Sequence, residues 1–176
     1  MDRIDILMKQ WQKERPDLDA SSMEVLGRIM LLNRFAESGF ERLLKPHNLT
    51  LPEFDVLAVM RRCGEPFKMS VGTLCSYSLL SSGAMTNRVD RLEKKGLVQR
   101  EPNPADRRGI LVVLTDKGFD LIESLIVLRL AETDRLTSLL SNEDQTNLAG
   151  ILKRLVASMQ TLDGYVDTAL DDLGPL

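Results

Sequence analysis

One stretch decides the fold: residues 81–98 have the sequence SSGAMTNRVDRLEKKGLV. Apolar side chains recur in it at helical spacing from residue 82 to residue 95, and Gly96 ends the helix. A shorter helix is predicted just before it, over residues 71–76, with only a brief connection between the two. Two short helices joined in this way are typical of a helix-turn-helix.

Directly after this helix pair the apolar pattern becomes that of β-strands. Strands are predicted over residues 97–101 and 109–114, and the Pro-rich loop between them carries Arg107 and Arg108. A strand pair with an Arg-tipped loop after a helix-turn-helix is a wing. The sequence therefore predicts a winged helix-turn-helix domain in a chain that is mainly α with a small β-wing.

Longer helices are predicted on both sides of this domain. Ser or Thr followed by an acidic residue marks each expected helix start. The pairs are Ser21 with Glu24, Thr50 with Glu53, Thr115 with Asp116, and Ser141 with Asp144. We expect three parts: residues 1–47 hold an extra N-terminal helix and a first stem helix, 48–114 the winged domain, and 115–176 the C-terminal stem helices. The apolar stripes of an all-helical stem need a surface to cover them.

Composition restricts the function. The chain has 176 residues, which fits one domain with a helical stem, and no apolar run long enough to span a membrane. The first residues lack the pattern of a secretory signal, and two cysteines, Cys63 and Cys75, are expected to be reduced in a cytoplasmic protein. A single histidine, His47, excludes a multi-histidine metal site within one chain. No cofactor is expected, and an enzyme is disfavoured.

Charge is concentrated in the middle of the sequence. From Ser81 to Arg108, seven Lys and Arg residues outnumber four Asp and Glu residues, although the whole chain carries a net charge of −3. A local basic patch on an acidic protein is typical of DNA binding through one face.

The helix over residues 82–95 has the polar N-terminal turns that a major-groove helix needs, because bulky residues there would hold it away from the bases. Its predicted inward stripe is Met85, Val89 and Leu92. We expect base contacts from the polar residues of the first turns and phosphate or minor-groove contacts from the cations. The predicted DNA-binding residues are Ser82, Thr86, Asn87, Arg91, Lys94, Arg107 and Arg108.

The segment 81–98, the Asp-Arg-Arg-Gly motif at 106–109 and the Leu-Thr-Asp-Lys-Gly motif at 114–118 together resemble the MarR family. Its members are dimeric winged-helix transcriptional regulators, and the resemblance extends over about residues 22–165. It implies a homodimer whose stem helices interlock and whose recognition helices, about 34 Å apart, bind a pseudo-palindromic operator in double-stranded DNA. A membrane partner is not expected.

The N-terminal helix suggests one branch of that family. The extra helix over about residues 2–13, which carries Trp11, is similar to that of the PecS-like, urate-responsive branch. The ligand residues of that branch match Trp11, Asp55, Arg88 and Arg100 of this sequence. The resemblance implies a repressor that releases its operator on binding urate or a related purine.

The expected chemistry is that of a planar anion. Trp11 would offer a flat apolar face and Arg88 a charge-assisted fork, while Asp55 and Arg100 would form an ion pair that a bound anion disturbs. Because Arg88 belongs to the helix over residues 82–95, which is the recognition helix in this family, moving it would displace Thr86 and Asn87 from the bases.

Other interpretations stay open at this point. Each of the four ligand residues also has an ordinary structural role available, in the core, at a helix start, on a strand or at a phosphate. A phenolic or other aromatic acid is the alternative effector, whereas thiol oxidation is less favoured because Cys63 and Cys75 look like small buried apolar residues. A small enzyme or a winged-helix adaptor is the alternative of a different class.

Overall fold

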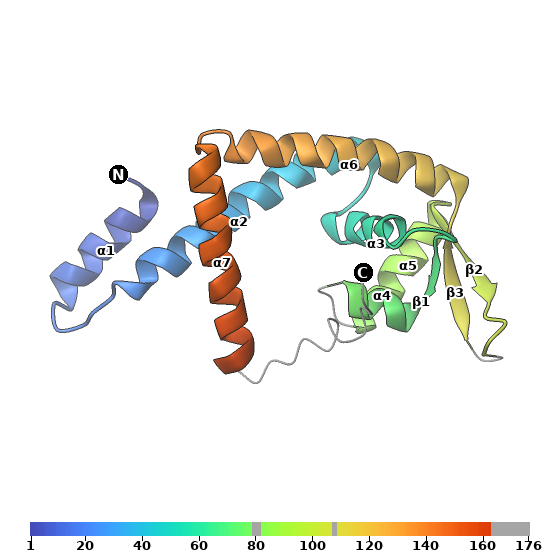
Figure 1. Ribbon diagram of the computed structural model, residues 1–176, viewed down its shortest axis with the longest axis horizontal. Coiled ribbons are helices and arrows are strands. Elements are labelled where there is room, and N and C mark those ends of the chain that lie inside the picture. The colour runs from blue at the N-terminus through green and yellow to red at the C-terminus, as the bar shows by residue number, and fades with distance from the viewer. Residues whose placement is uncertain (79–81, 107–108, 163–176) are drawn as a thin grey trace. The chain divides into compact units, whose positions relative to one another are not determined.

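The computed structural model describes residues 1–78, 82–106 and 109–162. The chain falls into two compact units, Met1–Arg42 and Leu43–Leu176. Figure 1 labels the helices and strands of both. The predicted division into three functional parts at residues 47 and 114 stays a prediction.

The first unit is a helical hairpin. Helix α1 (Arg3–Glu14) begins with a capping box between Asp2 and Asp5. Helix α2 (Ser22–Leu44) continues into the second unit. Arg28 of α2 donates to Asp2 at 2.9 Å and to Asp5 at 2.5 Å, so the start of α1 is fastened to α2. An apolar groove of about 490 Å³, lined by residues that include Ile4, Leu7 and Met30, lies between the two helices.

The second unit contains the winged helix. Its elements are a short 3-10 helix (Lys45–His47), α3 (Leu51–Arg62), β1 (Lys68–Ser70), α4 (Val71–Tyr77), α5 (Ser82–Lys94), β2 (Val98–Pro102), β3 (Ile110–Leu114), α6 (Asp116–Thr137) and α7 (Asn142–Leu162). Every helix of the helix-turn-helix and both wing strands lie where the sequence predicts, to within one or two residues.

The three strands form one antiparallel sheet in the order β1-β3-β2. Val98 pairs with Leu114 and Pro102 with Ile110, which makes β2 and β3 the predicted hairpin. Strand β1, which pairs Met69 with Val112, was not predicted from the sequence. Three residues are too short for an alternating pattern, so this strand is defined only by its pairing with β3.

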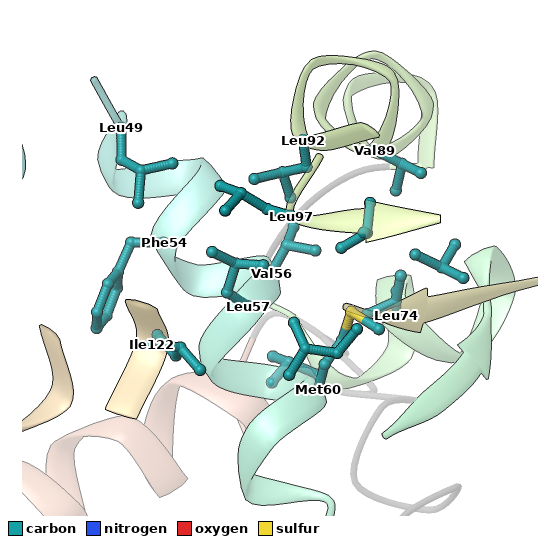
Figure 2. Packing of buried hydrophobic residues seen from close by; sticks show 14 of the residues in the cluster. Leu49, Phe54, Val56, Leu57, Met60, Leu74, Val89, Leu92, Leu97 and Ile122 are labelled. Atoms are coloured by element: carbon teal, nitrogen blue, oxygen red, sulfur yellow. The ribbon is translucent and has the colours of Figure 1, made fainter. Parts of the chain in front are cut away.

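The core of the second unit lies where α3 meets α4, α5, β2, β3 and α6. Figure 2 shows the apolar side chains of these elements gathered into one cluster. Its fully buried members include Val56, Leu57, Met60, Leu74, Met85, Val89, Leu92 and Ile122. The inward stripe predicted for the recognition helix is therefore confirmed.

Local signals in the sequence explain most helix ends. The capping box of Thr50 and Glu53 opens α3, and the Thr115 hydroxyl accepts from the Gly118 N–H at the start of α6. Gly96, at φ +70°, ends α5 in the left-handed region that glycine adopts without strain. A Cβ at Gly118 would lie 2.0 Å from the carbonyl oxygen of Leu97, so only glycine lets α6 approach the chain here.

Several helices carry large apolar side chains that remain exposed in the single chain. They are Val25, Met30, Leu32 and Phe35 on α2, Val127, Leu128 and Leu130 on α6, and Leu148, Ile151, Val156 and Met159 on α7. Within the described parts of the chain, no helix combines the length and apolar character needed to cross a lipid bilayer.

Candidate nucleic-acid interface and anion site

The outer face of α5 carries the predicted DNA-contacting side chains. Thr86, Asn87, Arg91 and Lys94 are exposed, while the opposite side of the helix is buried in the core. Ser82 is the first residue of α5. An exposed helix face with small polar residues in its first turns and cations further along can enter a major groove and contact its phosphates.

The wing loop is closed by backbone hydrogen bonds. The N–H of Asn103 donates to the carbonyl of Gly109 at 3.0 Å, and the N–H of Gly109 donates to the carbonyl of Asp106 at 2.9 Å. The two predicted wing contacts, Arg107 and Arg108, lie outside the described residues.

Arg100, on β2, bridges to the recognition helix. Its Nη2 donates to Asp90 Oδ1 at 2.5 Å, and its Nη1 donates to Glu93 Oε2. The predicted ion pair of Arg100 with Asp55 is therefore wrong, because both ends of the guanidinium are taken by acids of α5. A role of Arg100 in ligand binding stays a prediction.

Asp55 lies instead in a group of cations drawn from three helices. Burial raises the pKa of Asp55, although the charges of Arg129, Arg88 and Arg62 oppose the rise. We call these four residues the Asp55 cluster: Asp55 and Arg62 come from α3, Arg88 from α5 and Arg129 from α6. Arg62 is also held by a 2.6 Å hydrogen bond to the carbonyl of Tyr77.

Arg88 is the member that belongs to the recognition helix. Its Nη1 atom is buried and has no hydrogen-bond partner among the described residues. A buried guanidinium N–H without an acceptor is costly, and an anion would supply the missing acceptor. Arg88 is therefore the clearest candidate anion ligand on α5.

Arg129 was not predicted from the sequence. Its guanidinium lies 5.3 Å from the centre of the Phe54 ring, next in sequence to Asp55. Burial lowers the pKa of Arg129, and the charge of Asp55 partly offsets that effect. It follows Leu125, which is fully buried, by one helical turn. A cation on the inward side of α6 was the only signal in the sequence for this role. The sequence does not show its partner, because Asp55 lies 74 positions earlier.

Two further residues singled out in the sequence, Trp11 and His47, are not members of this cluster. Trp11 is 42% exposed on α1, in the first unit, and neither the groove between α1 and α2 nor a second one beside α1 includes it. His47 is exposed. Among the described residues, no three His, Cys, Asp or Glu side chains are arranged to hold a metal ion.

The two cysteines differ from expectation. Cys63 was expected to be buried but is exposed, because it occupies the C-cap of α3 where the helix leaves the core. Cys75 is half-buried, and burial raises the pKa of its thiol, although the charge of Arg88 lowers it. A raised pKa reduces the thiolate fraction of Cys75, which does not favour its reaction with oxidants.

The recognition helix is also fastened to α3. Lys95 Nζ lies 2.8 Å from both carboxylate oxygens of Glu53 and 2.7 Å from the carbonyl of Asn48. Glu53 is buried, so its capping box and its charge are both satisfied inside the protein. The sequence predicts the capping box, but not this ion pair.

Comparisons with known proteins agree with this architecture. The MarR family model matches residues 47–109. The HTH-type transcriptional regulator PecS of Dickeya dadantii is 32% identical over 149 residues, which cover 85% of this chain and 90% of PecS. This similarity supports the PecS-like branch of the family.

Solved structures show the same fold. AbsC, a MarR family regulator from Streptomyces coelicolor, superposes with a TM-score of 0.73 at 26% identity, over 82% of this chain and 97% of AbsC. A MarR mutant from Escherichia coli complexed with operator DNA gives a TM-score of 0.67 at 28% identity, over 82% and 96% of the two chains. These relatives are regulators of transcription and not enzymes. The chain belongs to the MarR family of winged-helix, DNA-binding transcriptional regulators.

Proposed function

We propose that this regulator is a homodimeric repressor that releases its operator when urate or a related purine anion binds at the Asp55 cluster. The observation that carries the proposal is the buried Nη1 of Arg88, which lacks an acceptor among the described residues. This atom belongs to α5, the helix expected to read DNA, so an anion bound to it would act directly on the element that contacts the operator.

The charge of the cluster favours an anion. Arg62, Arg88 and Arg129 act on one carboxylate, Asp55, so cations are in excess. An anion that accepts from Arg88 would meet the charge of Asp55 in a partly desolvated site, where repulsion is stronger than in water. That repulsion would displace Asp55 and Arg88 relative to each other, and with Arg88 the whole of α5.

Aromatic groups support a planar effector. The ring of Phe54 already lies against Arg129, and Trp11 is exposed on α1. Trp11 stays in the proposed ligand set as the stacking face. Arg100 stays in it because movement of α5 would change its bridge to that helix. PecS supports the purine class only through the branch resemblance.

The dimer is proposed from the exposed apolar faces of α2, α6 and α7. Covering a large apolar side chain contributes roughly 1.5–3 kcal/mol, so a second copy of the chain would be stabilised on these helices. Two recognition helices about 34 Å apart would then match one turn of B-DNA and select a pseudo-palindromic operator.

The test uses the fluorescence of Trp11, the single tryptophan of the chain. Purified protein is titrated with urate, xanthine and salicylate, and the same ligands are added to a complex with a labelled duplex selected from random-sequence DNA. We expect urate to quench Trp11 and to release the duplex. Release by salicylate alone would assign a phenolic acid as effector, and no response to any of the three would contradict the proposal.

Two variants locate the site. Arg88→Ala should abolish the quenching, because it removes the guanidinium that binds the anion. Arg91→Ala, one turn away on the exposed face of the same helix, is the matched control: it should weaken DNA binding and leave the quenching by urate unchanged. If both variants quench like the wild type, the Asp55 cluster is not the ligand site.

A further inference from the structure

We infer that Arg100 is a positioning residue for operator recognition: it fixes the wing strand β2 against the recognition helix α5 through Asp90 and Glu93. This role concerns the DNA complex and does not depend on any effector.

The geometry of the bridge is that of a fork. Asp90 and Glu93 are three residues apart, so they share one face of α5. The two terminal nitrogens of Arg100 reach one acid each, with Nη2 2.5 Å from Asp90 Oδ1. The Arg100 side chain is only 25% exposed, so water and salt screen the bridge less than a surface ion pair.

The position of Arg100 on the strand gives the bridge its importance. Val98 and Arg100 project from the same side of β2, because side chains alternate along a strand. Val98 is buried in the core, so it holds the first residue of the strand. Arg100 is the next contact on that side, before the strand continues to the wing loop. On this side of β2, one apolar contact and one ionic fork therefore hold the strand, while Val112 and Leu114 hold its partner β3 in the core.

The bridge also controls charge on the DNA-facing helix. The carboxylates of Asp90 and Glu93 are 45% and 39% exposed, and they lie on the same helix as Arg91 and Lys94. Without Arg100 they would stand uncompensated near the phosphates that these cations contact. The hydrogen bond to Asp90 and the charges of both acids raise the pKa of Arg100, so its guanidinium stays charged at any physiological pH.

The test is a double-mutant cycle. Arg100→Met is made in the wild type and in an Asp90→Asn plus Glu93→Gln background, where the acids carry no charge. Binding is measured by fluorescence anisotropy to the selected duplex and to a scrambled duplex of equal length. In the wild-type background we expect Arg100→Met to lower the ratio of selected to scrambled binding about tenfold. In the neutral background we expect a change below about twofold.

Two results would overturn the inference. An equal loss in both backgrounds would mean that Arg100 contacts DNA directly. In that case Arg100→Met would also lower the slope of log affinity against log salt by about one unit in the neutral background. An unchanged ratio in the wild-type background would mean that the bridge does not position the wing.

Matched controls separate this role from simple folding. Gln99→Ala alters the exposed neighbour of Arg100 on β2 and should leave the binding ratio unchanged. Thermal unfolding of each variant shows that binding is measured on folded protein. Because no urate or other effector is added, failure of the proposed effector response would not affect the outcome.

Discussion

Helices α3 and α2 differ in what becomes of their apolar side chains. On α3, Val56, Leu57 and Met60 are completely buried by the helices and strands of the winged unit. On α2, Met30 and Phe35 remain 70% and 58% exposed in the single chain. The winged unit thus builds its core from its own sequence, whereas α2 keeps an apolar face exposed in the single chain.

This difference separates two sources of stability. The core of the winged unit contributes to folding of one chain, and its contribution is independent of protein concentration. The exposed face of α2 would contribute only on association, so its contribution depends on concentration. Substitutions on α3 should therefore change the unfolding of one chain, whereas substitutions on α2 should change its association.

The largest effect is expected in the core. Leu57→Ala removes a fully buried side chain and leaves a cavity, which should lower the free energy of unfolding by about 2–5 kcal/mol. Urea unfolding followed by circular dichroism measures this loss. Leu32→Ala on α2 is the control, and an equal loss that does not depend on protein concentration would abolish the distinction between the two helices.

The next effect concerns the buried ion pair that fastens α5 to α3. Glu53→Gln leaves Lys95 without its carboxylate and should cost about 2 kcal/mol at neutral pH, less than a fully buried pair because Lys95 is partly exposed. Burial alone would raise the pKa of Glu53. The hydrogen bonds and charge of Lys95, together with the hydrogen bonds from Thr50, lower it below the ordinary value of 4.5.

The sign of the pH dependence follows from that lowered pKa. The stabilisation is present above pH 4.5, the ordinary value expected in the unfolded chain, and is lost as the pH falls through the folded-state pKa. The difference in stability between wild type and Glu53→Gln should therefore shrink in acid. Urea unfolding at a series of pH values measures it, and a difference that grows in acid would contradict the account.

An effect of similar size is expected on α2, but on association and not on the folding of one chain. Phe35→Glu places a charge on the exposed apolar face of α2 and should weaken the proposed dimer by about 2 kcal/mol, or roughly thirtyfold. Analytical ultracentrifugation across protein concentrations measures the dissociation constant. Glu41→Gln, an exposed change on the same helix, should leave it unchanged. A wild-type chain that is monomeric throughout would remove the explanation for the exposed face.

The smallest effect is expected on the DNA-facing side of the winged unit. Arg91→Ala should reduce operator affinity about fivefold and lower the slope of log affinity against log salt by about 0.9, because one phosphate contact is lost. The slope is obtained from anisotropy titrations between about 50 and 200 mM salt. A slope equal to that of the wild type would show that Arg91 contacts no phosphate.

The features predicted correctly from the sequence depend on neighbours along the chain. The capping box of Thr50 and Glu53, the glycine at the end of α5 and the inward stripe of Met85, Val89 and Leu92 all involve residues within one or two turns. Helical periodicity and the hairpin pattern of β2 and β3 are local in the same sense. These local signals were sufficient to predict the winged helix-turn-helix.

The features that sequence reasoning missed depend on distant partners. Strand β1 exists because Met69 pairs with Val112, and Arg129 reaches Asp55 only through the packing of α6 on α3. Arg100 pairs with acids of α5 and not with Asp55. A single sequence does not show which of several carboxylates an arginine will pair with, because all of them have the right charge. Long-range pairing of charges is a property of the folded packing, and no local pattern encodes it.

The central claim is that one residue, Arg88, couples effector and operator, and reciprocal binding tests it most directly. The dissociation constant of urate is measured by quenching of Trp11, with free protein and with protein saturated by the selected duplex. Coupling between two sites is mutual, so urate should bind the DNA complex more weakly by the same factor by which it weakens DNA binding. Equal affinity of urate for free and DNA-bound protein would contradict the account.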